Sequence, residues 1–248
     1  MKVGMTSLTL RDKSIENVFE CAKKAELDGI EWGVSEKHVS LDNDAQIDKI
    51  KEESRKSGIE IFSLGSYCRM TDKDECDKTL SVAVKLGAPI IRIWAGGKSP
   101  RECDNEYIDM IVKNTVYMAE KAQKYNVKLG FEYHSYTLTE TADGAVELIK
   151  RINCPNVGLY WQPDGNLSVE QNIEDRNKVL HYCVGNIHIQ NYNEVDGYMP
   201  LEKISDRIHS FFGDIKDKDY NVMIEFVKES KCENVINDAV VLKTVIDK

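Results

Sequence analysis

Short apolar runs alternate along this chain with longer segments in which apolar residues recur at helical spacing. The runs are four to seven residues long and rich in Ile, Val and aromatic residues, as expected of parallel strands that are buried on both faces. They lie at 2–7, 29–32, 59–64, 89–94, 127–133, 157–161, 185–190 and 221–226. We therefore predict eight strands.

The segments between these runs predict helices. In one of them, Ile108, Ile111, Val112 and residues 115–118 form a single stripe, which is typical of a helix that packs one face on a core. The predicted helices are 15–27, 45–57, 78–86, 107–125, 143–151, 169–180, 201–212 and 234–246. Eight strands that alternate with eight helices predict an α/β fold, the closed (β/α)8 barrel.

The main alternative is an open, doubly wound sheet. Such a sheet usually carries a glycine-rich phosphate loop, and the sequence contains neither GxGxxG nor GxxxxGK[ST]. The chain has five prolines and no low-complexity or linker-like stretch, so nothing marks a domain boundary. We predict that residues 1–248 form a single domain.

Polar side chains interrupt several of the predicted strands. Successive side chains of a strand point to opposite faces. Within each strand, the polar residues therefore lie on one face and the aliphatic residues on the other. They are Arg92, Glu132, His134, Gln162, Asn186, His188, Gln190 and Glu225. If the aliphatic face packs on the helices, the polar face points into the barrel. Most of these residues lie near the carboxyl ends of their strands, where barrel enzymes build their active sites.

A structural explanation competes with a functional one at each position. Glu132 alone is explained by a buried ion pair with Arg92. For Glu132 and Glu225 together, with His134 and His188 in register, we favour a functional site. His38, after the second predicted strand, fits a loop histidine and a site residue equally well. Three tryptophans at strand ends fit either the core or a sugar pocket. These are Trp32, Trp94 and Trp161.

Composition narrows the class of protein. Charged residues make up 30% of the chain and the net charge is −9, which argues against a nucleic-acid surface because phosphates require clustered Lys and Arg. The seven cysteines include no CxxC pair and are predicted to be free thiols in a reducing cytoplasm. There is no secretory signal pattern, and no apolar run approaches the length of a membrane span. We expect a cytoplasmic protein with no membrane or nucleic-acid partner.

Four motifs of the chain resemble those of one superfamily. They are GFEYHSYTLTET (130–141), NVGLYWQPDGN (156–166), NIHIQNYN (186–193) and VMIEFVKES (222–230). In this order they resemble strands 5 to 8 of the xylose isomerase-like barrels, a superfamily of sugar phosphate isomerases and epimerases. DGIEWGVSEKHV (28–39), SLGSYCRM (63–70) and IRIWAGG (91–97) are similar to segments of one subgroup. The resemblance covers the whole chain, and it is more specific for the superfamily than for the reaction.

The resemblance also implies a divalent metal ion, with Mn²⁺ or Mg²⁺ favoured and Zn²⁺ or Co²⁺ as alternatives. The implied ligands are Glu132, Gln162, His188 and Glu225. Gln162 stands where the metal-dependent members have Asp, and an amide oxygen adds no charge. Gly165 replaces a histidine of that motif, and Asn191 stands where many members have Asp.

The chemistry that suits this set is proton transfer next to a carbonyl through an enediolate. Glu132 and Glu225 are the predicted catalytic acid and base on a sugar or sugar phosphate. Arg69 or Arg92 would hold a phosphate or carboxylate, and Glu31 would hydrogen-bond sugar hydroxyls. The predicted substrate-binding residues are Glu31, His38, Arg69, Arg92, Trp94, His134 and Trp161.

The sequence leaves two other functions open and argues against a third. A sugar or cyclitol dehydratase would use nearly the same site, and a barrel without the metal would only bind sugar. A DNA-repair endonuclease of the superfamily needs more His, Asp and Glu ligands than this chain supplies. The expected partner is a small carbohydrate, and a homo-oligomer is compatible with the sequence.

Overall fold

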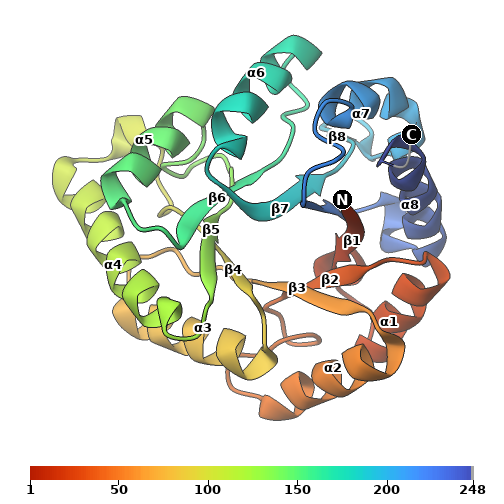
Figure 1. Cartoon of the computed structure of the whole chain (residues 1–248), viewed down its shortest axis with the longest axis horizontal. Helices are drawn as coiled ribbons and strands as arrows, with labels where there is room; N and C mark the ends of the chain where they lie inside the picture. The colour runs from red at the N-terminus through yellow and green to blue at the C-terminus, as the bar shows by residue number, and fades with distance from the viewer. Residues whose placement is uncertain (247–248) are drawn as a thin grey trace. The chain divides into compact units, whose positions relative to one another are not determined.

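Eight parallel strands close into a barrel in this computed structural model, which describes residues 1–246 (Figure 1). Their order is β1-β10-β7-β6-β5-β4-β3-β2. The strands are β1 (Lys2–Thr6), β2 (Gly29–Gly33), β3 (Glu60–Gly65), β4 (Ile90–Ile93), β5 (Lys128–Phe131), β6 (Val157–Trp161), β7 (Cys183–Ile189) and β10 (Asn221–Ile224). Each overlaps one predicted run, and the predicted (β/α)8 barrel is confirmed.

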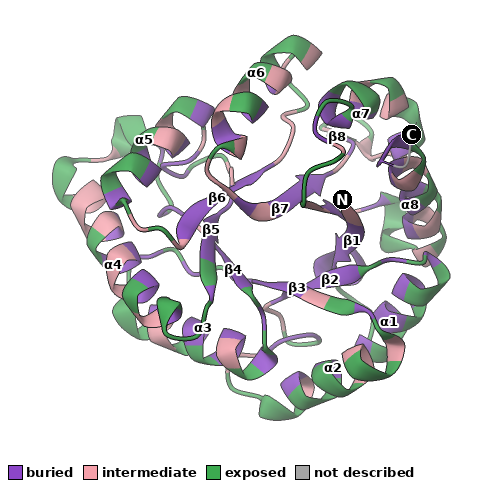
Figure 2. Ribbon diagram, viewed as in Figure 1, coloured by how far each residue is buried: buried purple, intermediate pink, exposed green. Residues whose placement is uncertain are grey.

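Helices follow the strands as the spacing predicts. They are α1 (Ile15–Lys24), α2 (Asp44–Ser57), α3 (Lys73–Leu86), α4 (Asn105–Gln123), α5 (Ala142–Ile152), α6 (Val169–Leu180), α7 (Ser205–Phe212) and α8 (Cys232–Ile246). Short 3₁₀ helices are η1 (Ser7–Leu10), η2 (Pro100–Glu102), η3 (Leu201–Ile204) and η4 (Lys228–Ser230). Figure 2 shows the helices buried along one side and exposed along the other, while the strands are almost wholly buried. Within residues 1–246, no helix combines the length and the apolar character that a membrane crossing requires.

Two predicted helices differ most from the observed ones. α3 begins five residues before the predicted start, because the side chain of Asp72 caps the helix by accepting a hydrogen bond from the backbone of Asp74. Its first turn is polar and exposed, so the apolar pattern begins only later. The predicted helix 201–212 is divided into η3 and α7.

The chain forms two compact units. The first comprises Met1–Phe62, Gln162–Glu174 and the chain from Gly185 onward. Here β2 pairs with β1, β1 with β10, and β10 with β7. The second comprises Ser63–Trp161 and Asp175–Val184. There β3 pairs with β4, β4 with β5, and β5 with β6.

Within the first unit, the polar faces of two strands point the same way. Asn221 of β10 is the register partner of Asn186 in β7, and its side-chain amide donates to the Asn186 side chain at 2.9 Å. His188 lies two residues beyond Asn186, on the same face of β7. The Asn186–Asn221 pair therefore forms a satisfied polar layer next to the layer that contains His188.

A large aromatic ring occupies the neighbouring part of the first unit. A Cβ atom on Gly29 would lie 2.2 Å from the Phe62 ring, and one on Gly4 would lie 2.6 Å from it. Both positions are therefore restricted to glycine by close packing. Gly29 precedes Glu31 by two residues on one face of β2, so the ring fills the layer beneath that carboxylate.

One prediction about the cysteines is wrong. Cys21 of α1 and Cys232 of α8 form a disulfide, although all seven cysteines were expected to be free thiols. The pair is 211 residues apart in the sequence and meets because α1 and α8 are in contact. Neither spacing nor composition marks such a pair. The remaining five are free, as expected; these are Cys68, Cys76, Cys103, Cys154 and Cys183.

Candidate functional site

A buried histidine lies between two carboxylates in the first unit. His188 of β7 is fully buried, and its Nδ1 atom is 3.3 Å from a carboxylate oxygen of Glu225. Its Nε2 atom is 3.4 Å from a carboxylate oxygen of Glu31 in β2. Glu225 follows β10 directly, and its backbone N–H continues the ladder by donating to Ile189 at 2.9 Å. Three strands thus fix the three side chains.

These carboxylates change the acidity of the imidazole. Burial of the ring is the largest single influence, and by itself it lowers the pKa of His188. Glu225 and Glu31 outweigh it through charge and hydrogen bonding, and they raise the pKa to about 10. The two carboxylates therefore favour the charged form of the ring over the neutral form when no metal ion is bound.

In the second unit, a carboxylate is paired with a guanidinium. The Nη1 atom of Arg92 in β4 forms a short ion pair with Glu132, and both side chains are buried. Glu132 follows β5, and its backbone N–H donates to Ile93 at 2.9 Å. The Thr139 hydroxyl donates to the Glu132 carbonyl at 2.7 Å. The sequence had offered this ion pair as the structural explanation of Glu132. Arg92 therefore holds the Glu132 carboxylate, whether or not it also contacts a substrate.

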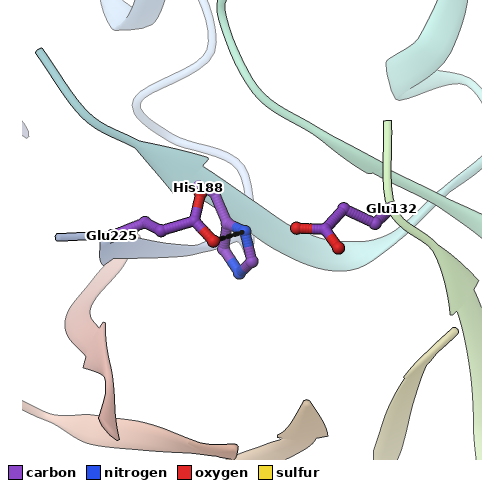
Figure 3. A group of neighbouring side chains, drawn as sticks. All are labelled: Glu132, His188 and Glu225. Carbon is purple, nitrogen blue, oxygen red and sulfur yellow. Dashed lines mark ion pairs between the residues drawn. The ribbon is translucent and has the colours of Figure 1, made fainter. Parts of the chain in front are cut away.

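Three of the predicted residues form a group with the geometry of a metal site. Glu132, His188 and Glu225 each offer one ligand atom, and these atoms all lie within 4.8 Å of one another (Figure 3). Figure 3 also shows the ion pair between His188 and Glu225. Two carboxylates and one imidazole suit Mn²⁺, Mg²⁺ or Zn²⁺. The donor set therefore fits the divalent ion that the resemblance implies.

The family of the chain follows from comparison with known proteins. The family model described as xylose isomerase-like TIM barrel matches residues 19–239. The chain belongs to this family.

Relatives and solved structures extend this finding. A protein of Mycoplasma pneumoniae, described as a probable L-ribulose-5-phosphate 3-epimerase (UlaE), is 31% identical over 198 residues, which is 68% of this chain and 64% of that protein. The chain thus spans just under two thirds of that relative's length. The probable 3-DHS dehydratase AsbF of Bacillus anthracis has a TM-score of 0.79 at 16% identity, over 98% of this chain and 99% of the other. A xylose isomerase-like TIM barrel protein of Mycobacterium smegmatis, in complex with magnesium, has a TM-score of 0.71 at 16% identity, over 99% and 96%. These structures share the fold.

Gln162 is the position at which this member of the xylose isomerase-like family departs from the implied ligand set. It follows β6 directly, is partly exposed as a residue, and has a buried side-chain oxygen. An amide oxygen is a weaker donor to a divalent ion than a carboxylate. Its role as a fourth ligand stays a prediction.

Other predicted substrate residues form an aromatic stack in the second unit. The rings of Trp94 and His134 are stacked with centroids 4.3 Å apart. The Arg69 guanidinium lies 4.5 Å from the centroid of the Trp94 ring and donates to the Gly96 carbonyl at 3.2 Å. Arg69 is exposed, and the indole nitrogen of Trp94 is buried without a hydrogen-bond partner among residues 1–246. Arg69 is therefore better placed than Arg92 to meet an anion from solvent.

The remaining predicted residues are buried. His38 is fully buried, with its ring nitrogen Nε2 3.1 Å from the Lys13 carbonyl and its ring edge against Trp32. Burial lowers the pKa of His38, which favours a neutral ring. Trp161 and Glu31 are also buried. Contacts of these residues with substrate stay predictions, and burial makes them less direct than the sequence implied.

Sequence reasoning missed an aromatic cluster in the first unit. A short hairpin of β8 (Tyr192–Asn193) and β9 (Gly197–Tyr198) follows β7. The Tyr198 ring lies 5.2 Å from that of Phe226, the residue after Glu225. Burial raises the pKa of Tyr198, and the charge of Glu225 raises it further. A signal was present, because a glycine just after a three-residue loop is typical of one class of hairpin, and Gly197 follows the loop 194–196 with a φ of 68°.

Proposed function

We propose that the protein is a sugar or sugar-phosphate isomerase or epimerase that moves a proton next to a carbonyl. The observation that carries this proposal is the buried group of Glu132, His188 and Glu225. Two carboxylates on different strands let one remove a proton while the other returns it. Return to the opposite face of the same carbon gives epimerisation, and return to the neighbouring carbon gives aldose–ketose isomerisation.

The surrounding residues orient these two glutamates. Arg92 fixes the carboxylate of Glu132, and His188 fixes that of Glu225. Both carboxylates are held by side chains that are themselves buried, so little reorganisation is needed when the proton moves. We assign the exposed Arg69 to a phosphate or carboxylate of the substrate, and the Trp94–His134 stack to its sugar ring.

A divalent ion fits this proposal, with Glu132, His188 and Glu225 as ligands and Gln162 as a neutral fourth. When bound, it supplies Lewis-acid stabilisation of the charge that develops on the carbonyl oxygen. The magnesium in the Mycobacterium smegmatis protein supports such an ion, and the Mycoplasma pneumoniae relative supports epimerase chemistry on a sugar phosphate.

The proposal is tested by exchange with solvent deuterium. Purified protein supplied with Mn²⁺ is incubated in D₂O with a panel of ketoses and ketose phosphates, and the products are analysed by mass and NMR. We expect deuterium at the carbon next to the carbonyl of at least one substrate. Glu225→Gln should abolish the exchange, and Glu52→Gln, a change of an exposed carboxylate on α2, should leave it intact.

Two outcomes would overturn the assignment. A product lighter than its substrate by one water identifies a dehydratase instead. Tight sugar binding with no deuterium in any compound identifies a non-catalytic binding protein.

A further inference from the structure

Glu31 is a carboxylate beside His188 that lies outside the candidate metal group. That group consists of Glu132, His188 and Glu225 among the described residues. Glu31 lies 3.4 Å from one ring nitrogen of His188, and Glu225 lies 3.3 Å from the other. The exposed fraction of Glu31 is 1%. The sequence predicted that this carboxylate hydrogen-bonds sugar hydroxyls, and its position beside His188 gives it a second role.

The two ring nitrogens of His188 therefore face different surroundings. Nδ1 faces Glu225, and their separation of 3.3 Å matches two ligands that share one ion at bond lengths of about 2.1 Å. Nε2 faces Glu31 at 3.4 Å. A neutral imidazole carries a proton on only one nitrogen, and a hydrogen bond at that nitrogen decides which one it is. A ligating histidine commonly donates this second N–H to a carboxylate.

We infer that Glu31 is a positioning residue, which accepts the Nε2–H of His188 and thereby presents Nδ1 to the site shared with Glu225. The role of this arrangement in catalysis rests on the proposed function. The contact itself does not, because the Glu31 carboxylate lies 3.4 Å from Nε2 whether or not the proposed reaction takes place. β2 and β7 supply the two partners, so the strand framework of the first unit sets the ring orientation.

The test compares Glu31→Gln with the native protein by two measurements. The first is ¹H–¹⁵N NMR of the His188 ring, assigned with His188→Gln, in metal-free protein. We expect a protected Nε2–H resonance in the native protein, and a clear shift or loss of protection in Glu31→Gln, because the charged acceptor is gone. The second is calorimetric titration with Mn²⁺, in which Glu31→Gln should bind at least about tenfold more weakly.

Kinetics separate positioning from substrate contact. With the sugar identified by deuterium exchange, Glu31→Gln should lower kcat with little change in KM. Glu52→Gln should leave the NMR signal, the metal affinity and the kinetics unchanged. If Glu31→Gln does not fold, Glu31→Asp, which keeps the charge and shortens the reach, should shift the same ring resonance.

The outcomes are distinguishable from those of the proposed function. An unchanged His188 ring spectrum in the Glu31 variant overturns the inference, as does a rise in KM with unchanged metal affinity. A native protein that binds no Mn²⁺ refutes the metal part of the proposed function, and the ring spectrum still decides the role of Glu31.

Discussion

The two units of the molecule bury charge in different ways. In the first, an imidazole lies between the carboxylates of Glu31 and Glu225. In the second, the Glu132 carboxylate lies against the guanidinium of Arg92. A guanidinium keeps its proton at any pH that a protein tolerates, whereas an imidazole can release one. The first arrangement can therefore exchange a proton for a metal ion, and the second holds a carboxylate in a fixed place.

The largest expected effect is on turnover, and we expect it to be equally large for a variant in either unit. Glu132→Gln and Glu225→Gln should each lower kcat at least about a hundredfold, since each removes a proton acceptor. The measurement is deuterium exchange or turnover on the substrate found by screening. Wild-type turnover in both variants would remove the proton-transfer assignment altogether.

The next prediction separates the units by stability. Glu132→Gln leaves the Arg92 charge buried beside a neutral amide, which should lower the free energy of unfolding by about 3 kcal/mol. Glu225→Gln should cost less, because His188 keeps Glu31 and can adjust its protonation. Urea unfolding of both variants at pH 7 measures the difference. Equal losses would mean that the two buried ion pairs behave alike.

Adding charge to the first unit should have a smaller effect. Gln162→Asp places a third carboxylate in the implied ligand set and should tighten Mn²⁺ binding about tenfold, because affinity rises with ligand charge. Gln162→Asn, which shortens the side chain without adding charge, is the matched control. Calorimetry on metal-stripped protein gives both affinities. If Asp binds no more tightly than Asn, Gln162 does not contact the ion.

A third kind of buried carboxyl, without a cation beside it, extends the comparison between the two units. Asp238 of α8 has a backbone N–H as its partner instead of a cation, with Leu201 donating at 2.9 Å. Burial raises its pKa from 3.8 to about 6, and this hydrogen bond opposes the rise. Between about pH 4 and 6 the unfolded chain releases the proton that the folded state retains. The stability contribution of this group therefore falls as the pH rises through that window.

Asp238→Asn keeps an acceptor for Leu201 and removes the titration. The variant should gain stability relative to the native protein by about 1–3 kcal/mol between pH 4 and 7. Urea unfolding across this range measures the gain. A difference that does not depend on pH would show that the burial of Asp238 has no electrostatic cost.

The sequence was most informative where burial is uniform. All eight strands could be located because parallel barrel strands are apolar on both faces, and β6 was predicted with its observed bounds. Helix starts were harder, as α3 shows, because a polar first turn carries no apolar period. The apolar strands also made the candidate site residues visible. Each of Glu132, His188 and Glu225 is a polar residue that interrupts an apolar run.

The sequence could not show which side chains contact each other in the folded chain. It raised Arg92 as a partner of Glu132 and as a substrate residue, and only the folded chain places it on that carboxylate. Glu31 was assigned to sugar hydroxyls from its place at the end of the second predicted strand, which does not show that its carboxylate also contacts His188. The distance from Glu31 to His188 depends on how β2 and β7 are arranged, which no local pattern contains.

The disulfide between Cys21 and Cys232 has a consequence for covalent topology. It ties the first helix to the last, so nearly the whole barrel lies inside one closed covalent loop. A protease that cuts a single surface loop between these cysteines would open the backbone without releasing a fragment. The cut chain would keep its mass on a non-reducing gel and separate into two pieces only after a thiol reductant is added.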